Sequence, residues 1–136
     1  MDRLVILAEQ IATKAHDGQT RWNGSPYIVH PRAVAEYFHE SNIDCRVVGW
    51  LHDVLEDTNY TSKRLVDEGI PQRLVYAVES ISKRKRQNYY DFIIQCSNNT
   101  ISKEVKISDL KNNLSDLVEG NLKDKYRMAL HILENG

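Results

Sequence analysis

The sequence predicts an all-α protein built from about seven or eight helices. Apolar residues recur at intervals of three and four along most of the chain, and no stretch alternates convincingly between apolar and polar residues as a half-buried strand does. Prolines, glycines and capping residues divide these apolar segments from one another. The chain has 136 residues, of which 41% are hydrophobic and 27% charged, as is typical of one globular domain. We therefore expect residues 1–136 to form a single domain.

The N-terminal part predicts one helix followed by a long loop. Asp2 can cap a helix whose apolar residues continue at helical spacing to Ala15, and Gly18 can end it. Residues 17–31, DGQTRWNGSPYIVHP, include two glycines and two prolines. This composition is typical of a loop, so we expect irregular structure there.

The middle of the chain predicts three more helices. Pro31 favours the first position of a helix because its fixed φ suits that position, which would leave His30 just outside the helix. The next helix is expected over about residues 44–57. Thr61 or Ser62 can then cap a short helix.

The C-terminal half predicts the remaining helices. Pro71 stands at the start of PQRLVYAVESI, and NYYDFIIQC is expected to be helical despite its two adjacent isoleucines. Residues 102–114 place several apolar side chains on one face. Asn121 can cap the last helix, whose expected apolar stripe is Leu122, Tyr126, Ala129, Leu130 and Leu133.

Charge and composition limit the partners that the protein can have. The 18 basic and 19 acidic residues give a formal net charge of −1, which makes nucleic acid an unlikely partner. No apolar run approaches the ~20 residues that span a bilayer, so no membrane partner is expected. Cys45 and Cys96 lack metal-site or redox spacing and are expected to be reduced, packed thiols. These features predict a cytoplasmic location.

The helix expected over residues 44–57 ends in an unusual way. Its apolar part, VVGWL, is followed by HDVLEDT, which places four ionisable side chains within six residues: His52, Asp53, Glu56 and Asp57. Burying unpaired carboxylates is costly. Either this helix end is solvated, or a cation lies among its acids.

The chain offers four candidate ligands for a divalent ion: His30, His52, Asp53 and Asp109. Adjacent helical residues point about 100° apart, yet His52 and Asp53 can still reach one ion at the helix edge. Two imidazoles and two carboxylates leave two positions of an octahedral ion for water or a phosphate oxygen, which suits Mn²⁺ better than a closed zinc site. Glu56 and Asp57 could face the ion without binding it and could orient or deprotonate a water.

A simpler interpretation stays open at this point. A His-Asp pair often occurs by chance, Asp57 and Thr58 could merely end a helix, and Asp109 could be a surface acid beside Lys106 and Lys111. Periodicity alone does not decide between a metal site and solvated side chains.

Three segments resemble a known family. KAHDGQTRWNGSPYIVHP, WLHDVLEDT and VKISDLKNNL resemble, in this order, the signature segments of the HD-superfamily hydrolase domain of RelA/SpoT homologues. The small single-domain alarmone hydrolases are the most similar type, and the resemblance runs from about Thr13 to Leu114. It implies a single HD-domain helical bundle, without a synthetase domain in residues 1–136.

The resemblance also implies roles for individual residues. It places the metal ligands on His30, His52, Asp53 and Asp109, and the catalytic acid pair on Glu56 and Asp57. It places Asn113 beside the substrate ribose and Arg21 among the substrate contacts.

The activity that the resemblance implies is removal of the 3′-pyrophosphate from guanosine tetra- or pentaphosphate, with one Mn²⁺ ion per chain. The expected partner is therefore a small nucleotide, and the oligomeric state stays open. Some relatives act instead on the 2′-phosphate of NADPH. Two alternatives remain: another HD phosphohydrolase, such as a 5′-nucleotidase, and a nucleotide-sensing module without turnover.

Further substrate contacts are predicted around the motifs. Trp22 stands where the family often has a basic residue and could stack on a purine. Lys14 is a further candidate phosphate contact. The basic run KRKR, residues 83–86, is either a solvated loop or a source of cations for the substrate's phosphates, with Lys83 and Arg84 as the candidates.

Overall fold

The computed structural model describes residues 2–117 and 120–136. Over these residues the chain forms helices and no strand, which confirms the predicted all-α class. The nine helical segments are α1 (Arg3–Ala15), α2 (Val29–Glu36), α3 (Ile43–Leu51), α4 (Val54–Asp57), α5 (Ser62–Asp67), α6 (Gln72–Ser80), α7 (Tyr89–Ser97), α8 (Thr100–Asp116) and α9 (Asn121–Asn135). The single helix expected over residues 44–57 is divided into α3 and α4, with a break at His52 and Asp53.

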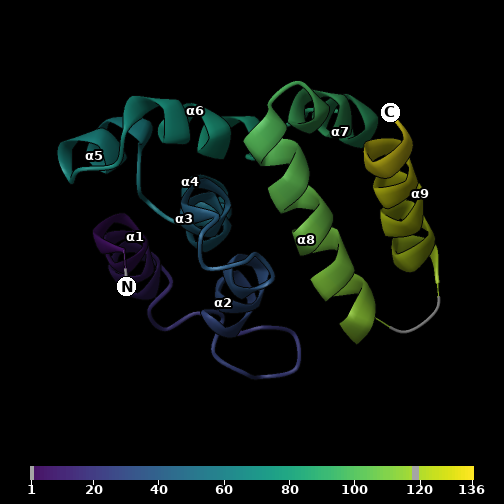
Figure 1. Ribbon diagram of the computed structural model, residues 1–136. Helices are drawn as coiled ribbons and strands as arrows, with labels where there is room; N and C mark the ends of the chain where they lie inside the picture. Colours follow the sequence, from purple (N-terminus) through teal and green to yellow (C-terminus); the bar gives the residue numbers. More distant parts are fainter. Residues whose placement is uncertain (1, 118–119) are drawn as a thin grey trace.

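Helix α3 is the centre of the bundle. Figure 1 shows it nearly end-on, with α1, α2, α6 and α8 around it, and these four helices all contact it. Its sequence explains this position, because residues 47–51, VVGWL, are buried without a polar interruption. A helix that is apolar on all sides is stable only when other helices cover it.

Gly49 allows α2 and α3 to approach closely. A Cβ added to Gly49 would lie 2.8 Å from the Cα of Ala35 and 3.0 Å from its backbone nitrogen. No side chain fits at that distance from a backbone. The glycine therefore fixes the spacing between the two helices that carry His30 and His52.

Helix α8 is held in the bundle by buried hydroxyl groups as well as by apolar contacts. Ser102 donates a hydrogen bond to the carbonyl of Ala77 on α6, and Ser108 donates one to the carbonyl of Val34 on α2. Both serines are buried and satisfied, so neither carries a desolvation penalty. These bonds fix how α8 presents the residues between and beyond them, Asp109 included.

The predicted helix starts are largely confirmed. The side chains of Asp2 and Thr61 accept backbone N–H bonds at the starts of α1 and α5, as predicted. Asn88 caps α7 in the same way, which was not predicted. The expectation for Asn121 is wrong: Gly120 occupies the N-cap and Asn121 is the first helical residue of α9. Leu122, expected on the apolar stripe, is 48% exposed.

The start of α2 also differs from the prediction. The helix begins at Val29, so His30 lies in its first turn rather than outside it. Pro31 is the third helical residue, where its missing N–H costs nothing because the first-turn N–H groups have no intrahelical acceptor. Pro31 therefore predicts the first turn of α2 correctly, but not the residue at which the helix begins.

Other expectations concern the thiols and the membrane. Cys45 and Cys96 are both free and buried, as predicted. None of the helices in the described ranges is long and apolar enough to cross a bilayer.

Candidate active site

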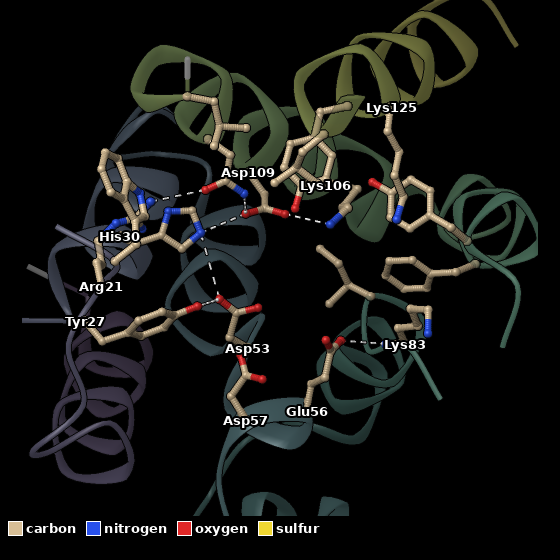
Figure 2. Close-up of a pocket in the computed structure, with 18 of the residues that line it drawn as sticks. Arg21, Tyr27, His30, Asp53, Glu56, Asp57, Lys83, Lys106, Asp109 and Lys125 are labelled. Carbon is tan, nitrogen blue, oxygen red and sulfur yellow. Dashed lines mark hydrogen bonds and ion pairs between the residues drawn. The ribbon is translucent and has the colours of Figure 1, made fainter. Parts of the chain in front are cut away.

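The structure brings His30, His52, Asp53 and Asp109 together. The Nε2 atom of His30 lies 2.8 Å from Oδ1 of Asp109 and 3.8 Å from Oδ2 of Asp53. The Nε2 atom of His52 lies 3.0 Å from the same Asp53 oxygen and 3.3 Å from the same Asp109 oxygen. The two Nε2 atoms are themselves 3.3 Å apart. Four side chains from α2, the α3–α4 junction and α8 thus converge on one point. Figure 2 shows three of them, His30, Asp53 and Asp109.

The break between α3 and α4 makes this convergence possible. His52 and Asp53 occupy the break, and Asp53 has φ −102° and ψ −2°, away from regular helical geometry. In an unbroken helix these adjacent side chains would point about 100° apart. The break lets both face His30, and the carboxylate of Asp53 makes no capping bond to its own helix.

Each imidazole is oriented by a hydrogen bond on its other nitrogen. Nδ1 of His52 lies 2.7 Å from the carbonyl oxygen of Gly49, and Nδ1 of His30 lies 2.6 Å from Oδ1 of Asn112. Both partners are acceptors, so each Nδ1 carries the proton and donates it. The Nε2 lone pairs are therefore free to bind a cation, as in metal sites whose histidines donate their second N–H to a carbonyl.

The two carboxylates are held from outside the cluster. The hydroxyl of Tyr27 donates to Oδ2 of Asp53 at 2.5 Å, and the ammonium of Lys106 donates to Oδ2 of Asp109 at 2.7 Å. Burial alone would raise the pKa of Asp109, but the charges of Lys106 and His52 outweigh it and hold this pKa well below its usual range. Asp109 therefore stays ionised and offers its other oxygen to the cluster.

These residues fit a divalent cation. His30, His52 and Asp109 are buried and each offers one ligand atom, all within 4.8 Å of one another. Two imidazole nitrogens and carboxylate oxygens facing one point are all acceptors, so a cation or a proton must lie among them. In the ion-free protein the proton takes this place: burial would lower the pKa of His52, but Asp53 and Asp109 raise it well above its ordinary value. A metal-binding site is thus supported by the donor set itself.

Glu56 and Asp57 lie beside the cluster without joining it. Figure 2 shows both on the side of the cavity opposite Asp109 and Lys106. Glu56 accepts the backbone N–H of Lys83 at 2.8 Å, and burial raises its pKa. Burial, together with the negative charges of Asp53 and Glu56, raises the pKa of Asp57 to about 6. A carboxylate with such a pKa can take up a proton near neutral pH.

The backbone of Asp57 is also fixed. The side-chain amide of Gln19 donates to the carbonyl oxygen of Asp57 at 2.9 Å, and Nδ1 of His16 lies 2.8 Å from Oε1 of Gln19. His16 is buried, and burial lowers its pKa, so it is neutral at physiological pH. The loop after α1 thereby positions one of the two acids.

Three members of the cluster, His30, Asp53 and Asp109, line a cavity of about 510 Å³. Its lining combines acidic, basic and aromatic groups, which is suited to a phosphorylated molecule with a ring system. The lining residues outside the cluster and the acid pair include Arg21, Trp22, Tyr27, Lys83, Tyr89, Phe92, Lys106, Asn113, Lys125 and Tyr126.

The structure brings most of the predicted substrate contacts to this cavity. Arg21 and Asn113 line it and are joined by a hydrogen bond of 3.3 Å, and Asn113 also donates to Oδ1 of Asp109. Trp22 lines the cavity too and is 70% exposed. Lys83 lines it as well.

Lys14 and Arg84 do not line the cavity, against expectation. Lys14 lies on the exposed face of α1, beside Thr13 and Asp17. Arg84 is exposed in the loop between α6 and α7. That loop contains Arg86 at φ 65°, a left-handed conformation that turns the chain sharply.

Sequence reasoning missed several residues of the cavity. Lys106 was considered only as a surface neighbour of Asp109, and Tyr89, Lys125 and Tyr126 were not considered as site residues. Lys106 precedes Asp109 by three positions, so its place on the same helical face could have been found. The other three come from α7 and α9, whose packing against each other no local pattern indicates.

Comparisons with known proteins agree with the motifs. A guanosine-3′,5′-bis(diphosphate) 3′-pyrophosphohydrolase of Haemophilus influenzae is 33% identical over 137 positions, which cover 91% of this chain and 20% of that protein. The protein of the same name from Vibrio cholerae is 37% identical over 83 residues, covering 60% of this chain and 12% of that protein. The bifunctional (p)ppGpp synthase/hydrolase SpoT of Escherichia coli shows the same identity and coverage. The chain thus spans a fifth or less of these relatives.

A solved structure shares the fold. It is that of a metazoan ortholog of SpoT described as hydrolysing ppGpp and acting in starvation responses. It superposes with a TM-score of 0.76 at 18% identity, covering 100% of this chain and 88% of that one. No family model matches the chain. Over the described residues the protein is all-helical and shares the fold of that structure. The chain is a relative of the RelA/SpoT homologues, matching one portion of those longer proteins, and the resemblance predicted from its three motifs is confirmed.

Proposed function

We propose that the protein is a metal-dependent hydrolase that removes the 3′-pyrophosphate of guanosine tetra- or pentaphosphate. The observation that carries this proposal is the convergence of two imidazoles and two carboxylates in the wall of a cavity that also contains an acid pair and several cations. The names of the bacterial relatives support the same substrate.

His30, His52, Asp53 and Asp109 are proposed to hold one divalent ion per chain. The mixed nitrogen and oxygen donors favour Mn²⁺ over Mg²⁺, which prefers oxygen donors alone. An ion bound there would act as a Lewis acid, making water more acidic and offsetting negative charge on phosphate oxygens.

Asp57 is proposed as the general base. A water attacks the phosphorus attached to the ribose 3′ oxygen, and its proton passes to an Asp57 carboxylate oxygen. The bond between that phosphorus and the 3′ oxygen breaks, the 3′ oxygen takes up a proton from solvent, and pyrophosphate and the nucleotide leave as separate products. The raised pKa of Asp57, about 6, suits a group that must accept a proton near neutral pH.

Glu56 is proposed to orient the attacking water. The Lys83 N–H holds one oxygen of its carboxylate at 2.8 Å, which restricts the side chain and leaves the other oxygen available. The fixed hydrogen bond is suited to positioning, whereas Asp57, whose side chain has no such donor among the described residues, is better suited to proton transfer.

The cavity is proposed to hold the nucleotide around these groups. Its volume of about 510 Å³ lies within the usual range of small-molecule sites, roughly 300–1,000 Å³. Arg21, with its guanidinium on the cavity wall, is suited to contact a phosphate or the base, and Trp22 offers a surface for a purine. Lys83 supplies a further cation at the opposite wall.

The decisive experiment compares substrates and products. Protein supplied with Mn²⁺ is incubated with guanosine 3′-diphosphate 5′-diphosphate, with GTP, with NADPH and with deoxynucleoside monophosphates. We expect GDP and intact pyrophosphate from the first substrate, and no reaction of GTP, which has no 3′ phosphate. The Asp57→Asn variant, purified in parallel, shows whether a contaminating phosphatase contributes.

Other outcomes would identify a different activity. Orthophosphate released from deoxynucleotides would indicate a 5′-nucleotidase, and orthophosphate from NADPH would indicate a 2′-phosphatase. Binding of the guanosine nucleotide without turnover, in protein shown to hold Mn²⁺, would refute catalysis and favour a sensing module.

A further inference from the structure

Lys106 has hydrogen-bonding capacity that the protein does not use. Its side chain is only 13% exposed and its ammonium carries three N–H donors. Among the described residues, Oδ2 of Asp109 at 2.7 Å is the one hydrogen-bond acceptor recorded for it. The Nζ atom of Lys106 lies 5.2 Å from the centroid of the Phe92 ring, and the residue lines the cavity. A buried ammonium with unused donors needs a further acceptor.

The position of Lys106 relates it directly to the candidate metal site. Asp109 offers Oδ1 to the histidines and Oδ2 to Lys106. The two oxygens of one carboxylate therefore face two positive groups, the candidate ion on one side and the ammonium on the other. An anion bound at the candidate ion position would therefore be separated from this ammonium by one carboxylate group only.

Tyr89 contributes a second unused polar group to the same part of the cavity. Within the described part of the chain, its buried hydroxyl has no hydrogen-bond partner, although the residue lines the cavity. The charge of Lys106 acts on this hydroxyl and partly opposes the effect of burial, which raises the pKa of Tyr89 to about 12. The phenol therefore keeps its proton and remains a donor at neutral pH.

The cationic surroundings of Tyr89 favour an anion over a neutral ligand. The ammonium of Lys125 lies over its ring, 4.1 Å from the centroid, and Lys125 also lines the cavity. This part of the site thus has two ammonium groups and a phenol. Among the described residues, Asp109 is the one carboxylate hydrogen-bonded to either ammonium. Phosphate oxygens are acceptors with the charge that such donors require.

We propose that Lys106 and Tyr89 form a subsite for the outer phosphate of the 3′-pyrophosphate, beside the ion position and apart from Arg21. This inference rests on the proposed function and names the residues that recognise the pyrophosphoryl group transferred to water. As the bond to the 3′ oxygen breaks, pyrophosphate keeps its contacts to this subsite. A substrate with a 3′-monophosphate would not reach it and would bind less tightly.

Binding of inorganic pyrophosphate tests the subsite without requiring turnover. Pyrophosphate is titrated calorimetrically into Mn²⁺-loaded protein, with Mn²⁺ content measured separately by elemental analysis. We expect Lys106→Met to weaken binding about 10- to 100-fold, since it removes a charge-assisted hydrogen bond. Tyr89→Phe should weaken it about 3- to 10-fold, as loss of a neutral hydrogen bond does. Lys103→Met on α8 and Tyr90→Phe on α7, both outside the cavity, are matched controls.

Thermal unfolding without ligand makes the tyrosine variant decisive. Because the Tyr89 hydroxyl has no hydrogen-bond partner in residues 2–117 and 120–136, Tyr89→Phe should not lower the melting temperature. Lys106→Met leaves an Asp109 oxygen without its donor and can affect folding or metal content, so Tyr89→Phe keeps the proposal testable alone. Unchanged pyrophosphate affinity in Tyr89→Phe would overturn the subsite.

The outcomes also separate this inference from the proposed function. Wild-type protein that binds pyrophosphate through these residues but does not cleave the guanosine nucleotide would overturn the function and keep the subsite. Cleavage at the normal rate and affinity by Tyr89→Phe and by a metal-loaded Lys106→Met would keep the function and overturn the subsite.

Discussion

Replacing Asp57 by asparagine should stabilise the ion-free protein while abolishing most of its activity. The Asp57 carboxyl has an ordinary pKa of 3.8, which burial and the charges of Asp53 and Glu56 raise to about 6 in the folded protein. The folded state therefore binds this proton more tightly than the unfolded state does. Proton binding by Asp57 therefore contributes to the free energy of unfolding. This contribution is fully present below the unfolded pKa and is lost as the pH rises through the folded pKa.

The size of the effect follows from the difference between the two pKa values. At about 1.4 kcal/mol per pH unit, it has an upper bound of about 3 kcal/mol. Because the Asp57 side chain is partly exposed, solvent screening reduces this, and about 1 kcal/mol is the value to expect. An asparagine has no charge at any pH, so the variant does not have the free-energy cost of an ionised carboxyl at this position.

Urea unfolding in EDTA, at pH 4.5 and at pH 7.5, measures this effect. We expect Asp57→Asn to be more stable than the wild type by about 1 kcal/mol at pH 7.5 and by a smaller amount at pH 4.5, where wild-type Asp57 is largely protonated when folded. With Mn²⁺ restored, the hydrolysis rate of the variant should be about 10²- to 10⁴-fold lower. A stability difference that is the same at both pH values would refute the electrostatic reasoning.

Four further results are expected. Protein supplied with Mn²⁺ should hold about one ion per chain by elemental analysis, and EDTA should abolish turnover. The affinity for the ion, measured by titration, should fall as the pH is lowered, because protons compete for the imidazole nitrogens. Activity that is unaffected by EDTA would contradict this. Asp109→Ala should lose the ion and part of its thermal stability, whereas Glu56→Ala should keep the ion and lose about 10²- to 10⁴-fold in rate; equal loss of ion in both variants would refute the division of roles. Gly49→Ala should cost about 1–3 kcal/mol in urea unfolding, because its Cβ would lie 2.8 Å from the Cα of Ala35; wild-type stability would show that α2 and α3 can separate freely. Arg21→Ala should mainly raise KM in steady-state kinetics, since its contact serves ground and transition states alike; a fall in kcat at constant KM would assign it to catalysis.

Much of the fold could be predicted because its signals are local. Capping side chains at Asp2 and Thr61 fix helix starts within one turn, and the apolar spacing fixes which face is buried. The break at His52 and Asp53 could not be predicted, because Val54 is buried and continues the apolar pattern across it. Periodicity does not distinguish one helix from two consecutive helices with a common buried face.

The candidate ligands could be proposed from residue type, but their surroundings could not. Lys14 lies close in sequence to the loop that lines the cavity, yet it falls on the exposed face of α1. Tyr89 and Lys125 reach the cavity because α7 and α9 pack together, which is a contact between segments distant in the chain. Sequence patterns specify which side chains are chemically suitable, and tertiary packing decides which of them meet.

The break between α3 and α4 has a consequence for folding as well as for chemistry. It lets residues 52 and 53 face His30 and Asp109, which are separated from each other by 79 positions along the chain. An ion bound by all four would act as a cross-link between three parts of the bundle, closing long loops as a disulfide does. Its ligands are brought together only when α2, α3 and α8 are packed, so the ion would bind the folded chain far better than the unfolded one. Metal occupancy would then report whether the whole bundle is intact, and a damaged or partly unfolded chain would lose its cofactor before it could act on a substrate.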